Sequence, residues 1–142
     1  AIQPDGETVV FHSVPVAKAG GRRRYVAQGM ADLLQPYIGQ DAFAALEAVH
    51  SMPKQGVASS FSFGEGYGVW QGVLAALGIP YELVPPQRWM AAFGLDSDKG
   101  QRRLVVCRLF PAAVPGLSGQ GRAGEGRVDA LLLAEWGRRR QG

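Results

Sequence analysis

The stretch FAALEAV at residues 43–49 is apolar except for Glu47, and the expected fold follows from it. Its length and composition predict a buried strand. The run from 59 to 77 begins at a pair of serines and predicts a long helix that ends at Gly78. YELV at residues 81–84, closed by two prolines, predicts a second strand. This order of strand, helix and strand indicates an α/β domain with an at least partly parallel sheet.

On the amino-terminal side, the sequence predicts a hairpin, a loop and a helix. TVVFHS at residues 8–13 follows the turn signal at residues 4–6 and predicts one arm of a β-hairpin. The other arm is only the stub at residues 1–3, so we expect the first strand of the domain to be missing from this sequence. Glycines and a basic run at 15–24 predict a loop, and apolar residues at helical spacing over 25–37 predict a helix.

On the carboxyl-terminal side, helices alternate with loops. Helices are expected over residues 88–93, 99–110 and 128–136, and the glycine-rich segment 112–126 is expected to be a loop. A length of 142 residues suits one domain spanning the whole sequence.

Composition and charge narrow the class of protein. Hydrophobic residues make up 46% and charged residues 19%, which indicates a folded domain, and no apolar run is long enough for a membrane span. Residues 1–98 hold six Lys/Arg against nine Asp/Glu, whereas residues 99–142 hold nine against three. The basic carboxyl-terminal part, with a net charge of +6, indicates an anionic partner, most commonly nucleic acid. The single cysteine, Cys107, excludes a disulfide framework and a cysteine-based zinc cluster.

Three carboxylates are candidates for a metal site. Glu47 is costly to bury unless it is paired or bound to a metal, although a surface charge on an edge strand would also explain it. Glu125 and Asp129 are four residues apart, so one helix face can carry both; acidic residues favoured near a helix N-terminus are the alternative. Together the three describe a hard, oxygen-rich site suited to Mg²⁺ or Mn²⁺. His12 and His50 are too few and too scattered for zinc.

The predicted long helix is unusually rich in glycine. Each glycine costs roughly 1 kcal/mol relative to alanine in a helix interior, so several of them call for a reason, such as close approach to a sheet, a partner helix or DNA. We expect this helix to form the interface of a homodimer. Its glycines are Gly64, Gly66, Gly68 and Gly72, and its aromatic residues, expected in the core or the dimer interface, are Phe61, Phe63, Tyr67 and Trp70.

Several separate motifs, at compatible spacing, resemble the RuvC-like Holliday junction resolvases. The resemblance spans about 90 residues, from about residue 43 to residue 137, and the branch includes phage and bacterial relatives and the chloroplast resolvase of plants and algae. The motifs are EAVHSMPKQGVASSFSFGEGYGVW at 47–70, LAALGIP at 74–80, PQRW at 86–89, RRLVVCRLFP at 102–111 and GRVDALLLAEWG at 126–137.

The resemblance implies a ribonuclease-H-like fold with a mixed five-stranded sheet flanked by helices. It also implies four metal-binding positions. Glu47 matches the glutamate of the second strand, and Asp129 matches the carboxylate of the last helix. Glu125 stands where many members of this branch carry histidine. The first-strand aspartate of the family, in a Gly-x-Asp-Pro setting, has no match in this sequence.

The resemblance also assigns contacts with DNA. Lys99 matches a position where a lysine faces the scissile phosphate, and His50 falls where relatives place a ring against unstacked bases at the crossover. In the loop after His50, Lys54 and Gln55 are candidates for contacts with base edges or phosphates. The remaining candidates for DNA contact are Arg88, Arg102, Arg122 and Arg127.

The expected function is therefore that of a homodimeric endonuclease that resolves four-way DNA junctions by paired, Mg²⁺-dependent nicks. Two alternatives remain: a catalytically inactive DNA-binding module of the same fold, and a ribonuclease-H-like nuclease acting on other branched or hybrid substrates. A two-fold symmetric dimer would match a two-fold symmetric junction. The resemblance implies the chloroplast if the source is a plant or alga, and otherwise a bacterial cytoplasm or a phage.

Overall fold

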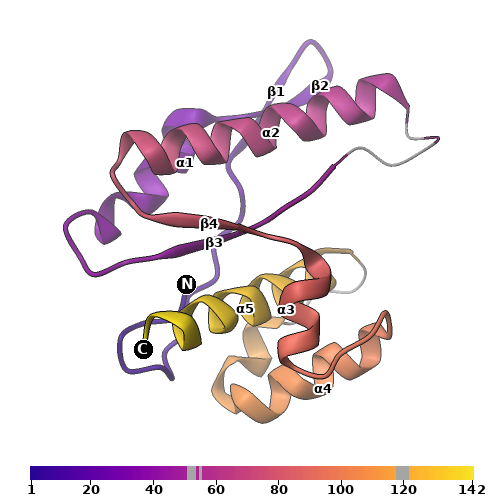
Figure 1. The fold of residues 1–142 in the computed structure, drawn as a ribbon. Coiled ribbons are helices and arrows are strands. Elements are labelled where there is room, and N and C mark those ends of the chain that lie inside the picture. Colours follow the sequence, from indigo (N-terminus) through magenta and orange to yellow (C-terminus); the bar gives the residue numbers. More distant parts are fainter. Residues whose placement is uncertain (51–53, 55, 118–121) are drawn as a thin grey trace. The chain divides into compact units, whose positions relative to one another are not determined.

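The structure is a computed structural model that describes residues 1–50, 54, 56–117 and 122–142, and its fold is mixed α/β (Figure 1). The side chains of Arg22, Lys99, Arg122 and Ala123 lie outside that description. The elements, in chain order, are β1 (Val16–Ala19), β2 (Arg22–Tyr25), α1 (Ala27–Leu34), η1 (Gln35–Tyr37), β3 (Ala44–Glu47), α2 (Val57–Ala76), β4 (Tyr81–Val84), α3 (Pro86–Ala92), α4 (Lys99–Leu109), η2 (Pro111–Leu117) and α5 (Arg122–Gln141).

The chain forms two compact units. The first unit comprises Ala1–Phe11, Ala45–Glu47 and Glu82–Gly142, and the second comprises His12–Ala44 and Ala48–Tyr81. The single domain expected from the length remains a prediction. Of the helices in the described part of the chain, none combines the length and the apolar character needed to cross a membrane.

Strands β3 and β4 pair in parallel, as the strand–helix–strand pattern predicts. Parallel neighbours need a crossover connection, and α2 lies in that connection. The helix begins at Val57 with Gly56 as its N-cap, not at the serine pair, because the backbone is already helical two residues earlier. In the described residues the paired strands form two sheets of two strands each, so the expected five-stranded sheet is not among them.

The first unit has the larger described core. Fully buried side chains from β4, α3, α4, η2 and α5 form one cluster, and α5 contacts α3, α4 and η2. The side chains of this cluster that are less than 2% exposed are Val84, Trp89, Val106, Leu117 and Leu132. Two expectations here were wrong. Part of the expected loop 112–126 is helical, because Ala113 and Leu117 are buried in this core; α5 begins at Arg122 and not at residue 128.

The amino-terminal segment of the first unit forms a short hairpin-like turn. Asp5 Oδ1 accepts hydrogen bonds from the backbone N–H groups of Glu7 and Thr8, at 2.9 and 2.8 Å. Ile2 and Val9 then form an antiparallel bridge, and both pack against the core. The expected strand over residues 8–13 is thus reduced to this one bridge in the described residues.

The second unit contains a hairpin that the sequence pattern did not reveal. β1 and β2 pair antiparallel across Gly20 and Gly21, whose φ angles of 57° and 75° suit a two-residue hairpin turn. The expectation of a loop over 15–24 was wrong because these strands are largely exposed and lack an apolar alternation. Helix α1 packs on α2 with Met30 fully buried, which confirms the predicted helix over part of its range.

Gly66 is the one α2 glycine with a packing reason in the described residues. A Cβ added there would overlap the ring of Tyr25, whereas one added at Gly64 would meet nothing within 4 Å. We expect Gly66→Ala to lower the free energy of unfolding by about 1–3 kcal/mol through overpacking. Gly64→Ala should instead raise the free energy of unfolding of the monomer by about 0.5–1 kcal/mol, as alanine normally does in a helix. Urea unfolding of the two variants checks the opposite signs; equal shifts would contradict the packing of Tyr25 on α2.

Candidate functional site

Glu47 is held by a hydrogen bond from a buried indole. The carboxylate stands at the end of β3, and Trp89 lies on α3, which Pro86 begins immediately after β4. Trp89 Nε1 donates to Glu47 Oε1 at 3.1 Å, and the Trp89 side chain is 1% exposed. Because the indole is fixed in the core, it fixes the position of one carboxylate oxygen at the end of the strand.

Asp129 is paired with Arg102 in the same unit. Arg102, on α4, donates from Nη1 to both carboxylate oxygens of Asp129, at 3.2 and 3.1 Å. The Arg102 side chain is only 14% exposed, whereas Asp129 is 37% exposed. A charge-assisted hydrogen bond to a side chain of such low exposure is stronger than a bond between two exposed groups.

Trp89 and Arg102 connect the two carboxylates. The guanidinium carbon of Arg102 lies 5.6 Å from the centroid of the Trp89 ring, within the range of a cation–π contact. Glu47 and Asp129 therefore stand at the two ends of a chain of contacts that runs through Trp89 and Arg102. We call these four residues the carboxylate network.

Arg102 carries a buried donor. Its Nε is buried and meets no hydrogen-bond acceptor among the described residues. A buried donor without an acceptor costs about 1–3 kcal/mol, and such a group in a folded protein calls for an explanation. The present partners of Arg102 therefore do not use all of its hydrogen-bonding capacity.

Glu125 lies in the first turn of α5, one turn before Asp129, and is exposed. Because α5 already begins at Arg122, Glu125 and Asp129 lie on the same helix, as their spacing of four residues allows. Among the side chains that the structure describes, no three His, Cys, Asp or Glu lie close enough to hold one metal ion. The described geometry thus brings Glu47 and Asp129 into one network but does not gather Glu47, Glu125 and Asp129 into a three-ligand cluster.

No protein-family model matches this sequence, and no curated protein does. The resemblance to RuvC-like resolvases therefore remains a prediction from the motifs.

Lys99 is the first residue of α4. The helix is capped by Asp98, whose Oδ1 accepts a hydrogen bond from the N–H of Gly100 at 2.8 Å. The side chains of Lys99 and Arg122 lie outside the described part of the structure, as does the whole of Gln55. Their expected contacts with phosphates remain predictions.

Two of the candidate DNA contacts belong to the second unit and are exposed. His50 lies three residues after Glu47, and Lys54 has a φ of 68°, an uncommon value for a residue other than glycine. Exposure fits an expected contact with a large ligand, and the expectation stays a prediction.

Arg88 and Arg127 bind groups of their own chain. Arg88 Nη1 donates to Glu82 Oε1 at 2.7 Å and the guanidinium lies over Trp136. Arg127 Nη1 donates to the carbonyl of Gly116 at 2.8 Å and stacks over Phe11. Arg127 therefore ties α5 to η2 and to the amino-terminal segment, a structural role that its place in the sequence did not indicate.

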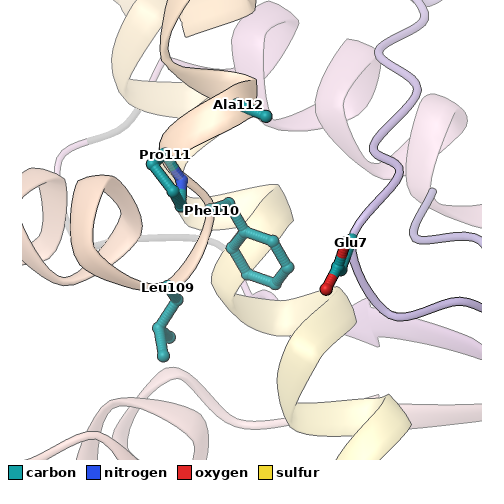
Figure 2. Close-up of a pocket in the computed structure, with 5 residues that line it drawn as sticks. All are labelled: Glu7, Leu109, Phe110, Pro111 and Ala112. Atoms are coloured by element: carbon teal, nitrogen blue, oxygen red, sulfur yellow. The ribbon is translucent and has the colours of Figure 1, made fainter.

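One surface hollow in the first unit lies at the junction of α4 and η2. It has a volume of about 360 Å³ and is lined by Glu7, Leu109, Phe110, Pro111 and Ala112. Figure 2 shows the Glu7 carboxylate on the amino-terminal segment facing the turn that carries Phe110. None of the predicted site residues lines it, so the hollow is not the candidate site.

Trp89 belongs to the candidate site through its contact with Glu47, although the sequence alone does not assign it there. It occurs in the PQRW motif, but it carries no titratable group that would indicate a chemical role. The available signal was a tryptophan in the short helix directly after the second buried strand, a position that faces the sheet.

Proposed function

We propose that this protein is a metal-dependent DNA endonuclease of the RuvC-like resolvase kind, with a ribonuclease-H-like fold. The observation that carries the proposal is the carboxylate network, in which a strand-end glutamate and a last-helix aspartate belong to one compact unit and are joined through Trp89 and Arg102. These two carboxylates are the positions that the motifs predict. The parallel pair β3–β4 with its helical crossover is compatible with part of the proposed five-stranded sheet.

The donor chemistry of the network fits Mg²⁺ or Mn²⁺. Both ions take carboxylate oxygens, and Glu47 and Asp129 supply these from a strand and a helix. Glu125, one helical turn before Asp129, is the third proposed ligand. When bound, such ions activate a water molecule and stabilise the leaving oxygen of a phosphodiester.

The chain's own residues would orient this site. Trp89 would orient Glu47 through its hydrogen bond to the carboxylate. Loss of a group that is hydrogen-bonded to a metal ligand typically lowers metal affinity or activity 10–100-fold. Arg102 neutralises Asp129, so a divalent cation at Asp129 competes with this arginine for the same oxygens. An arginine released from Asp129 has donors for a phosphate, including the Nε that now meets no acceptor among the described residues.

A homodimer is the second part of the proposal. Helix α2 has an exposed face without charges, which we call the small-residue stripe; it consists of Val57, Phe61, Gly64, Gly68, Gly72 and Ala75. Val57 and Phe61 are 87% and 74% exposed, and the three glycines would let another helix approach closely. Exposed apolar side chains beside such a surface are typical of protein–protein interfaces.

We expect Gly68→Leu to raise the dissociation constant of the dimer at least about tenfold, because the new side chain would hold two stripes apart. Ser59→Leu is the matched control, since Ser59 is exposed on the same helix but off the stripe. Sedimentation over a range of concentrations measures both variants. A wild-type protein that is monomeric throughout, or a Gly68→Leu variant that dimerises normally, would contradict this interface.

The function is tested with four labelled substrates: a four-way DNA junction, a linear duplex, a branched flap and an RNA–DNA hybrid. The proposal predicts paired nicks in the junction with Mg²⁺, none with EDTA, and little cleavage of the other three. Binding of the junction without nicking would instead favour a DNA-binding module. Cleavage of the hybrid as readily as the junction would replace the resolvase proposal with a broader nuclease.

A further inference from the structure

The carboxyl-terminal end of α5 carries a fixed cluster of arginines. The sequence alone allows these residues to be a solubilising tail, but α5 continues to Gln141 and includes all of them. A fourth arginine approaches from α3, and the group surrounds a buried glutamate and a buried tryptophan. We call Arg88, Arg138, Arg139 and Arg140 the arginine cluster.

Glu135 anchors two of these arginines. Its side chain is 3% exposed and lies one turn before them on α5. Arg138 donates from Nε and Nη2 to the two carboxylate oxygens at 2.7 and 3.0 Å, and Arg139 Nε donates at 2.8 Å. Burial acts to raise the pKa of Glu135, but the hydrogen bonds and charges of Arg138 and Arg139 outweigh it and hold that pKa below its ordinary value. The ionised carboxylate therefore keeps both guanidinium groups in place.

Aromatic rings contact three of the four guanidinium groups. Arg140 and Arg88 lie over Trp136, at 4.9 and 5.3 Å from the ring centroid, and Arg139 lies 4.9 Å from the centroid of Phe93. Cation–π contacts of this kind restrain a guanidinium without neutralising it. Ordering these side chains before a ligand arrives lowers the entropy cost of binding.

The cluster keeps an excess of positive charge at the surface. Glu135 binds Arg138 and Arg139, and Glu82 pairs with Arg88 at 2.7 Å and more loosely with Arg140 at 3.7 Å. The four positive charges of these arginines are therefore paired with only two carboxylates. Each arginine side chain remains between 46% and 49% exposed, so the charge faces solvent. Compensation of the helix dipole explains cations in the last turn but not the fourth arginine, which α3 supplies.

We propose that the arginine cluster binds backbone phosphates of duplex DNA, as a contact surface separate from the carboxylate network. The choice of DNA rests on the proposed nuclease function. The chemistry supports it, because planar guanidinium groups pair with phosphate oxygens through two parallel hydrogen bonds and all four cations here are arginine. Such contacts add affinity for any sequence and make binding depend on salt.

The test measures binding of the full chain to a short linear DNA duplex by fluorescence anisotropy, between about 50 and 200 mM salt. We expect Arg139→Gln/Arg140→Gln to weaken binding roughly tenfold and to lower the slope of log K against log salt by about 2. The matched control is Arg103→Gln/Arg108→Gln, which removes the same charge from exposed positions on α4. Its expected loss is less than about twofold. An equal loss of DNA affinity in the two double variants, or no loss in Arg139→Gln/Arg140→Gln, would overturn the proposal.

Arg140→Gln alone serves if the double variant unfolds, because Arg140 contacts the ring of Trp136 and reaches Glu82 only at 3.7 Å, and so leaves the buried Glu135 with its two partners, Arg138 and Arg139. It should lower the salt slope by about 1, and an unchanged slope overturns the proposal. Binding of the same variants to phosphatidylserine vesicles, measured by sedimentation, and to duplex RNA, measured by anisotropy, tests the other anionic partners. If the wild type binds either of them more tightly than duplex DNA, and the cluster variants lose that binding, the proposal is also overturned. Junction cleavage is recorded in parallel. Cluster-dependent DNA binding without cleavage removes the nuclease proposal alone, whereas cleavage with unchanged binding removes only this inference.

Discussion

Glu47→Gln is expected to lower the rate of junction cleavage roughly 1,000-fold, and Asp129→Asn to do the same. Each substitution keeps the shape of the side chain but removes the negative charge that a divalent cation requires. The stabilisation that a metal ion gives to a phosphodiester transition state amounts to several kcal/mol, and each ~1.4 kcal/mol is a factor of ten in rate. Single-turnover cleavage of a labelled four-way junction with Mg²⁺ measures the loss.

Binding and folding must be separated from chemistry in these variants. Junction affinity of Glu47→Gln, measured in EDTA, should stay within about twofold of the wild type, because Glu47 is not expected to contact DNA directly. Glu7→Gln is the matched control, since Glu7 is an exposed carboxylate of the same unit, outside the carboxylate network. A Glu47→Gln or Asp129→Asn variant that retains a tenth or more of wild-type cleavage would remove that residue from the proposed site.

Trp89→Ala should have the largest effect on stability, lowering the free energy of unfolding by about 3–5 kcal/mol. The side chain is fully buried in the core of the first unit, and its removal leaves a large cavity. It also deprives Glu47 of its hydrogen bond and Arg102 of its ring contact. Urea unfolding followed by circular dichroism measures the change.

Trp89→Phe separates the packing role from the positioning role. The phenyl ring retains most of the buried surface, but the N–H group that donates to Glu47 is lost. We expect a moderate loss of stability and a 10–100-fold loss of cleavage, the usual effect of removing a group that orients a metal ligand. Trp70→Phe, on α2 of the second unit, is the control and should cleave normally. Normal cleavage by Trp89→Phe would mean that the indole only fills the core.

The elements that the sequence predicted correctly have strong local patterns. The apolar run around Glu47 and the YELV stretch are β3 and β4, and the long helix between them is α2. The β1–β2 hairpin was missed because its exposed residues carry no apolar alternation, and its formation depends on a two-glycine turn. The early start of α5 was missed because glycines at its beginning resemble a loop, while the helix is stabilised by burial of residues such as Val128.

The candidate site could be predicted only as separate residues. Glu47 and Asp129 were named from their residue type and motif, and the structure adds the contacts that join them. Trp89 reaches Glu47 from 42 positions away, and Arg102 reaches Asp129 from 27 positions away, so both contacts depend on how the helices of the first unit pack. The binding of Arg127 to a carbonyl of its own chain also depends on tertiary contacts. The sequence cannot distinguish an arginine that binds a carbonyl from one that binds a phosphate.

Binding of Mn²⁺ tests most directly whether Glu47 and Asp129 form one cation site. Titration of the full chain with Mn²⁺, followed by the paramagnetic resonance signal of the free ion, requires neither DNA nor catalysis. The wild type and Glu7→Gln should remove Mn²⁺ from solution, each single variant at Glu47 or Asp129 should bind at least about tenfold more weakly, and the double variant should leave the signal unchanged. Equal Mn²⁺ binding by the wild type and by Glu47→Gln/Asp129→Asn would contradict the metal site and, with it, the nuclease.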